Sequence, residues 1–315
     1  MIERIREIAG KILRDANIFI GYERGFDAIH ATPLFVRKEE DLKRLIWDPT
    51  CVHNLASYLP YMKERCGVLV KGCDSRAIVQ YLQEGLIKRE DVVIVGVPCR
   101  GVVDVKAVMR KTGYRPILNA SFRNGRLVLR TDEAEKELVM EEALQGKCRR
   151  CLYPTPLLYD HLVSESILSD KDPDSVYADI LELEGRTCED RLSFWKRELS
   201  RCIRCYACRN ACPMCICRDS CIAETREPKW VTQRSNLQEK FMFHMIHALH
   251  LAGRCVECGE CERACPMEIP LLTIRRKVNL EMKRLFDYEA GIRPDERPPM
   301  YTFKVEEESI RDPEI

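Results

Sequence analysis

Hydrophobic positions in the first 145 residues alternate between helical and strand spacing. Ile5, Ile8 and Ile12 fall on one face of an opening helix, and residues 17–20 form a short apolar strand pattern. The apolar run at residues 67–70 predicts a buried parallel strand, and residues 91–97 predict a second one. Helical patterns follow these strands to about residue 86 and over 102–111. This alternation predicts an α/β domain at residues 1–145, with a parallel or mixed sheet and flanking helices.

Local patterns add detail to this predicted domain. Residues 39–47 and 55–63 have helical spacing, and the dipeptide Asn124-Gly125 between two apolar stretches predicts a β-hairpin. The helix after the first buried strand is expected to take Asp74 or Ser75 as its N-cap, because short polar side chains bind the free N–H groups of a first turn.

The pattern changes after residue 145. Residues 146–195 form a bridge with one Cys-x2-Cys pair, and residues 196–290 are rich in cysteine, with long helices predicted at 236–252 and 271–289. Residues 291–315 form an acidic, proline-rich tail that is predicted to be disordered or to lie on a partner. We therefore expect the α/β domain to be followed by an α-helical domain.

The 18 cysteines among 315 residues are the unusual feature of the composition. The sequence shows no apolar secretory segment and no run of the ~18 apolar residues that a spanning helix needs. We therefore expect a cytoplasmic location, where disulfides are rare and clustered thiols bind metal. The formal net charge of +1 gives no electrostatic reason to expect nucleic acid or an anionic membrane as a partner.

One cysteine pattern occurs twice in the predicted helical domain. Cys-x2-Cys-x2-Cys-x3-Cys-Pro begins at Cys202 and again at Cys255. In runs of this kind the first three thiolates bind one 4Fe-4S cluster, while the fourth faces away and binds the other. Crossed ligation then predicts a first-run group of Cys202, Cys205, Cys208 and Cys265, and a second-run group of Cys255, Cys258, Cys261 and Cys212. Zinc is the alternative, but zinc sites usually use two separated pairs of ligands.

The predicted sheet suggests a further cluster site. Cys73 and Cys99 each follow a buried strand, and cofactors of open α/β sheets lie beyond the carboxyl ends of the strands. Together with Cys148 and Cys151 they supply four thiols, which we call the third group and predict to hold a third 4Fe-4S cluster. The alternative is that Cys73 and Cys99 are simply small buried apolar residues.

Two resemblances follow from these motifs. Residues 196–290, with both runs and a long helical spacer, resemble the α-helical ferredoxin domain of the heterodisulfide reductase small subunit and of the succinate dehydrogenase iron–sulfur subunit. The upstream plant-type domain of the latter is missing, so the heterodisulfide reductase context is closer. Residues 67–156, with Lys71-Gly72-Cys73, Val97-Pro98-Cys99 and the Cys148/Cys151 pair, resemble the β subunits of deazaflavin-reducing hydrogenase and formate dehydrogenase. That family implies one 4Fe-4S cluster on these four cysteines. Its glycine-rich entry for a flavin (FAD) has no equivalent before residue 67, so we expect little or no bound flavin.

The remaining cysteines and histidines leave alternatives open. Cys188, Cys215, Cys217 and Cys221 form either a fourth site or a set of unligated thiols, and Cys51 and Cys66 are predicted to be buried. Residues His244, His247 and His250 recur every third position on one predicted helix, either as a metal site or as ordinary packed or exposed side chains.

These features predict an electron-transfer subunit of an anaerobic oxidoreductase complex. Its expected partners are other redox subunits, namely a flavoprotein of the heterodisulfide reductase A type and a hydrogenase or formate dehydrogenase. One alternative is a flavin enzyme that oxidises or reduces a deazaflavin or a nicotinamide. A second alternative is a redox sensor or scaffold, for which a single exposed cluster would suffice.

Overall fold

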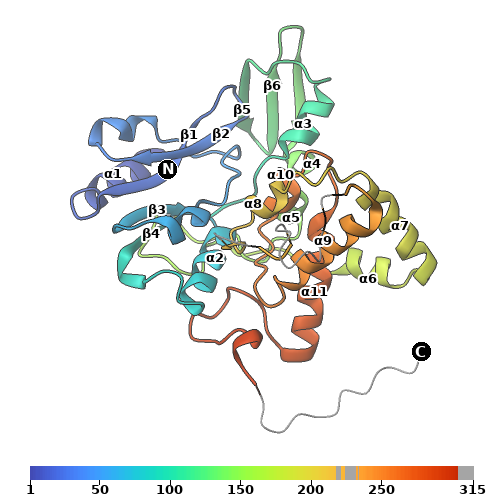
Figure 1. Ribbon diagram of the computed structural model, residues 1–315. Coiled ribbons are helices and arrows are strands. Elements are labelled where there is room, and N and C mark those ends of the chain that lie inside the picture. The colour runs from blue at the N-terminus through green and yellow to red at the C-terminus, as the bar shows by residue number, and fades with distance from the viewer. Residues whose placement is uncertain (218–220, 224–231, 233, 304–315) are drawn as a thin grey trace.

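The computed structural model describes residues 1–217, 221–223, 232 and 234–303 (Figure 1). Its main sheet has five strands in the order β2-β1-β3-β4-β8. These strands are β1 (Ile18–Arg24), β2 (Ala31–Val36), β3 (Cys66–Val70), β4 (Val92–Gly96) and β8 (His161–Leu162). The strands β1, β3, β4 and β8 run parallel, and β2 pairs antiparallel with β1. The predicted α/β class with a mixed sheet is therefore confirmed.

Helices flank this sheet. They are α1 (Ile2–Ile12), α2 (Gly72–Gln83) and α3 (Val105–Lys111), with the 3-10 helices η1 (Glu39–Arg44), η2 (Leu55–Tyr61) and η3 (Arg89–Asp91). The α-helices expected at 39–47 and 55–63 are thus short 3-10 segments, and Pro60 lies inside the second one. The predicted N-cap of α2 was also wrong. Lys71 is the N-cap, and Asp74 lies in the first turn, where its carboxylate accepts a 2.9 Å hydrogen bond from the Lys71 backbone N–H.

A second, antiparallel sheet projects beside α3 (Figure 1). Its strands are β5 (Asn119–Arg123), β6 (Arg126–Arg130) and β7 (Glu135–Val139), and α4 (Met140–Ala143) and α5 (Gly146–Arg149) follow. The predicted hairpin joins β5 to β6, with positive φ at both Asn124 (49°) and Gly125 (72°), as a type I′ turn requires.

The rest of the chain is helical. It contains α6 (Ala178–Glu184), α7 (Cys188–Ser200), α8 (Ala207–Asn210), α9 (Leu237–Leu249), α10 (Glu260–Ala264), α11 (Leu271–Phe286) and η4 (Pro299–Tyr301). The predicted long helices are α9 and α11. Residues 304–315 of the predicted tail lie outside the described residues, while Gln83 of α2 donates hydrogen bonds to the carbonyls of Arg293 and Glu296. No helix in the described part of the chain combines the length and apolar character that a membrane crossing requires.

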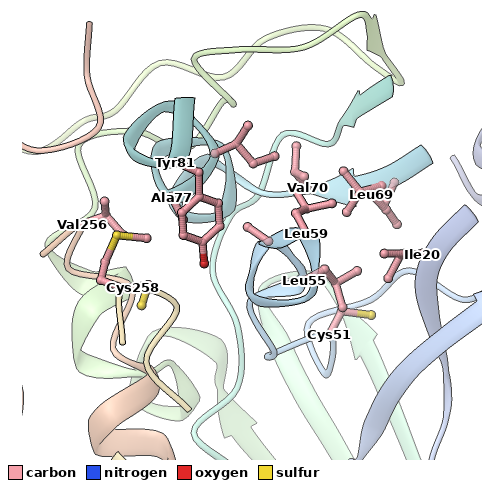
Figure 2. Packing of buried hydrophobic residues seen from close by; sticks show 14 of the residues in the cluster. Ile20, Cys51, Leu55, Leu59, Leu69, Val70, Ala77, Tyr81, Val256 and Cys258 are labelled. Atoms are coloured by element: carbon pink, nitrogen blue, oxygen red, sulfur yellow. The ribbon is translucent and has the colours of Figure 1, made fainter. Parts of the chain in front are cut away.

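One continuous core joins the main sheet to the helical region. It runs from α1 and β1 through α2 to the second cysteine run, and Figure 2 shows Ala77 and Tyr81 of α2 in the same cluster as Val256 and Cys258. The buried Tyr81 hydroxyl donates a 2.6 Å hydrogen bond to the Pro213 carbonyl. At the end of α2, Glu84 accepts two hydrogen bonds, at 2.7 and 2.6 Å, from Arg254, the residue before the second run. The helix α2 therefore fixes the sheet against both cysteine runs.

Candidate iron–sulfur sites

The two cysteine runs fold into loops with matching backbone conformation. In the first run Arg204 and Tyr206 have positive φ (53° and 59°), and in the second run Glu257 and Gly259 do (54° and 71°). Each pair brackets the second cysteine of its run, and the short helices α8 and α10 begin directly afterwards. Left-handed residues at these two positions turn each loop inward, so that the Arg204 N–H donates to the Cys202 sulfur at 3.3 Å.

The fourth cysteine of each run lies at the end of its short helix. Because α8 packs against α10, each helix brings its fourth cysteine toward the other loop. The Cys265 thiol interacts electrostatically with Cys202 and Cys208, whereas Cys212 interacts with Cys255, Cys258 and Cys261. The remaining member of the first-run group, Cys205, lies near Cys202 and is exposed. Each fourth cysteine therefore lies near leading cysteines of the other run, while Cys208 also interacts with Cys261 of the second-run group. Crossed ligation agrees with this placement and stays a prediction.

The third group also gathers at one place. Its four thiols line a cavity of about 600 Å³ at the carboxyl ends of β3 and β4. The Cys99 thiol interacts with those of Cys73 and Cys148, and Cys73 with that of Cys151. The segment after Cys151 runs against the start of α2, where a Cβ on Gly72 would lie 1.8 Å from the Tyr153 carbonyl oxygen. Only glycine permits this close approach, which carries the Cys-x2-Cys pair over the sheet edge.

Burial makes these free thiols poor acids. It raises the pKa of Cys73, Cys208, Cys255 and Cys261 to about 12, and it also raises the pKa values of Cys99 and Cys258. The pKa of Cys212 is also raised, first by its hydrogen bond with Cys215 and then by burial. None of the twelve cysteines in the three groups forms a disulfide bond. Iron would supply the positive charge that stabilises the thiolates, and the thiols would release their protons on binding.

Buried and half-buried lysines lie around the cysteine groups, and no motif in the sequence marks them. The buried Lys71 side chain pairs with Asp74 at 2.9 Å behind Cys73 and Cys99. The half-buried Lys147 reaches from the third group to the second run, where its ammonium donates to the Cys258 carbonyl. Gly259 leaves room for this side chain, because a Cβ there would lie 2.8 Å from Lys147 Cδ. From α3, the Lys106 ammonium donates to the Cys265 carbonyl.

The other candidate residues differ in burial and surroundings. Cys51 and Cys66 are buried in the core, as predicted. Cys188 and Cys217 are exposed and Cys221 is buried. The ligand atoms of Cys212, Cys215 and His247 lie within 4.8 Å of one another, and no fourth such side chain in the described ranges joins them. His244 is buried with Nε2 3.3 Å from the Cys202 sulfur, and His250 is exposed.

The donor sets fit 4Fe-4S clusters. Each of the three groups offers four thiols, and the positive-φ loops of the two runs point backbone N–H groups at sulfur. Backbone N–H groups of Gly101 and Val102 likewise donate to the sulfurs of Cys99 and Cys148 at 3.4 Å. Four thiolates with N–H donors around them are the ligation that cubane clusters use.

Comparison with known proteins supports the iron–sulfur assignment. Residues 198–269 match the family model described as a 4Fe-4S dicluster domain, which implies two 4Fe-4S clusters in this part of the chain. The predicted two-cluster domain is thus confirmed.

Similarity to known proteins also covers most of the chain. The chain is 22% identical over 347 aligned positions to the β subunit of an F420-dependent formate dehydrogenase from Methanocaldococcus jannaschii, covering 90% of this chain and 89% of the relative. It is 25% identical over 354 positions to the β subunit of F420-dependent formate dehydrogenase 1 from Methanococcus maripaludis, covering 92% and 90%. A solved F420-reducing [NiFe] hydrogenase complex from Methanosarcina barkeri contains a chain that matches with a TM-score of 0.38 and 15% identity, over 48% of this chain and 58% of that one. The resemblance predicted for residues 67–156 therefore extends, at low identity, over nine-tenths of the chain.

Proposed function

We propose that this protein is the iron–sulfur electron-transfer subunit of an anaerobic oxidoreductase complex of the hydrogenase, formate dehydrogenase or heterodisulfide reductase type. The observation that supports this most directly is the set of three groups of four thiols, two in the dicluster domain and one at the sheet edge. Bound 4Fe-4S clusters supply one-electron oxidation and reduction.

The side chains around the thiols would bind these clusters and adjust their properties. The thiolates would hold the iron, backbone N–H groups at the loops would donate to sulfur, and the nearby lysines would offset negative charge. The half-buried Lys147 precedes Cys148 of the third group, interacts electrostatically with Cys73 and donates to the Cys258 carbonyl of the second run, so these two groups are neighbours. Cys208 interacts with Cys261, which makes the first-run and second-run groups neighbours as well. We infer an order in which the second-run group lies between the other two.

The partners follow from the same argument. One redox partner would dock at the cavity of the third group, and another near the first-run group, where Cys205 and Ile203 are exposed. The relatives named above are β subunits of F420-dependent formate dehydrogenases. By analogy, we propose a hydrogenase or formate dehydrogenase on one side and a flavoprotein of the heterodisulfide reductase A type on the other.

Metal analysis of the anaerobically purified full-length protein tests this proposal. Three clusters correspond to about twelve irons and as many sulfides per chain. Dithionite-reduced protein should show EPR signals of interacting 4Fe-4S clusters. Stoichiometric zinc without iron would refute the proposal.

A flavin enzyme is the second candidate. It is favoured by the cavity beside the third group, whose volume of about 600 Å³ is typical of small-molecule sites and whose lining includes Tyr153 and Tyr177. We expect little or no flavin in the acid supernatant of the purified protein. One flavin per chain, measured by fluorescence, would favour the enzyme over the relay.

A further inference from the structure

Arg275 is a charged side chain buried inside the dicluster domain. It lies on α11 and is 4% exposed. Its Nη1 donates to the Leu271 carbonyl at 3.0 Å, its Nη2 donates to His247 Nδ1 at 2.7 Å, and its Nε has no hydrogen-bond partner. Among the described residues no carboxylate forms an ion pair with it. Burying an unpaired guanidinium and an unsatisfied N–H is costly, so this arrangement calls for a negative acceptor.

Arg275 interacts electrostatically with cysteines of both runs and with the Glu262 carboxylate, with which it forms no ion pair. Its charge is stabilised by Cys261, Cys212 and Cys255 of the second-run group and by Cys208 of the first-run group. The guanidinium therefore stands at the junction of the two sets of thiols.

Two contacts fix the orientation of the guanidinium. Because Arg275 donates to His247 Nδ1, the neutral ring carries its hydrogen on Nε2, which faces the Cys215 sulfur at 2.9 Å. The hydrogen bond from Nη1 to the Leu271 carbonyl oxygen holds the other end of the guanidinium. With both Nη atoms fixed, the Nε–H is left free for an acceptor supplied by a cluster.

We propose that Arg275 is a positioning residue shared by both clusters of the dicluster domain: its charge lies between them, and its free Nε–H donates to a cysteinyl or cluster sulfur. This inference rests on the proposed function. Reduction adds one electron to a group that is already negative, and a nearby positive charge in a low-dielectric interior stabilises the reduced form more than the oxidised form. Arg275 therefore raises the reduction potentials of both clusters together.

Redox titration of the full-length protein, followed by EPR, tests this proposal. The variant Arg275→Gln should lower the equilibrium constant for reduction of both dicluster clusters by about tenfold or more, which is about 59 mV per tenfold for one electron. Arg275→Lys keeps the charge and should restore most of the potential. Lys283→Met removes an exposed cation from the same helix and should change neither potential.

The outcomes separate this inference from the proposed function. Absence of iron from the wild-type protein would overturn the proposed function. Full iron content in Arg275→Gln with unchanged potentials, or a shift at one cluster only, would overturn the role of Arg275.

A second measurement applies if Arg275→Gln does not assemble its clusters. Wild-type protein containing arginine labelled with ¹⁵N only in the guanidinium group should show a ¹⁵N coupling in pulsed EPR of the reduced clusters. That coupling should be lost in Arg275→Lys. Its absence from the wild-type spectrum would refute the proposed Nε–H donation.

Discussion

Removing the Cys148 and Cys151 thiols tests the third group most directly. In the double variant Cys148→Ala, Cys151→Ala, two of the four thiols that line the cavity remain, too few to hold a cubane. With three groups of four thiols, the wild-type protein should bind about twelve irons and the variant about eight. Both side chains are half-buried at an open cavity, so their loss leaves no closed void in the core. We therefore expect the variant to remain folded.

The matched control changes two cysteines of the same sheet region. Cys51→Ala, Cys66→Ala removes the same number of sulfur atoms, but from the core, where the two side chains are 0% and 1% exposed. It should keep all its iron while losing roughly 1–2 kcal/mol of stability per site, since deletion of buried atoms leaves cavities.

Iron and acid-labile sulfide are measured on anaerobically purified proteins, with circular dichroism to confirm folding. EPR of the reduced double variant should retain both dicluster signals. If it keeps about twelve irons, the third group holds no cluster. If it loses about eight or more, the dicluster domain depends on these thiols, and our assignment of separate groups is wrong.

Three further predictions address the other contacts. Cys212→Ser should alter the same EPR signal as Cys258→Ser and a different one from Cys205→Ser; a match to Cys205→Ser would refute crossed ligation. Tyr81→Phe should lower the free energy of unfolding by about 1–3 kcal/mol, measured by denaturant titration of the anaerobic protein, because it leaves the buried Pro213 carbonyl unpaired; an unchanged midpoint would contradict this. Lys147→Met should lower the potentials of the third and second-run clusters but not that of the first-run cluster, with Lys147→Arg close to wild type; equal shifts at all three would mean that Lys147 does not lie between those two groups.

The sequence predicted the buried strands and long helices because their apolar periodicity is unambiguous. The strands β3 and β4 are continuous apolar runs, and both carry side chains buried on two faces. The strand β8 was not predicted, because a strand of two residues shows no periodicity. The segments η1 and η2 were predicted as α-helices but are 3-10 helices. The N-cap of α2 was misplaced because Asp74 serves the cap from the third position of the helix rather than from the cap itself.

The thiol ligands were predictable and their electrostatic surroundings were not. The spacing of cysteines along the sequence predicts the loop that binds a cluster. Lys147 and Arg275, in contrast, contact or interact with cysteines that are distant in sequence, and the sequence alone does not distinguish them from surface residues. A partial signal existed for Arg275. It lies one turn after Leu271 and one turn before Asn279, on the buried stripe of α11, where a cation is unexpected. A cation on the buried face of a helix indicates that a negative group lies nearby in the core. Only the folded structure identifies that group.

The contacts of α2 with both cysteine runs affect how the clusters are assembled and how the gene can evolve. The first turn of α2 carries Cys73, Tyr81 in its last turn binds the Pro213 carbonyl, and Glu84 just beyond its end binds Arg254 beside the second run. A ferredoxin domain that shares a core with a sheet in this way cannot be exchanged like an independent module, because its exposed inner face would be apolar. Biogenesis of the metal centres is therefore expected to be cooperative across the chain, with iron loading in one half stabilising the other. Gene fusions or deletions that separate the halves should be selected against.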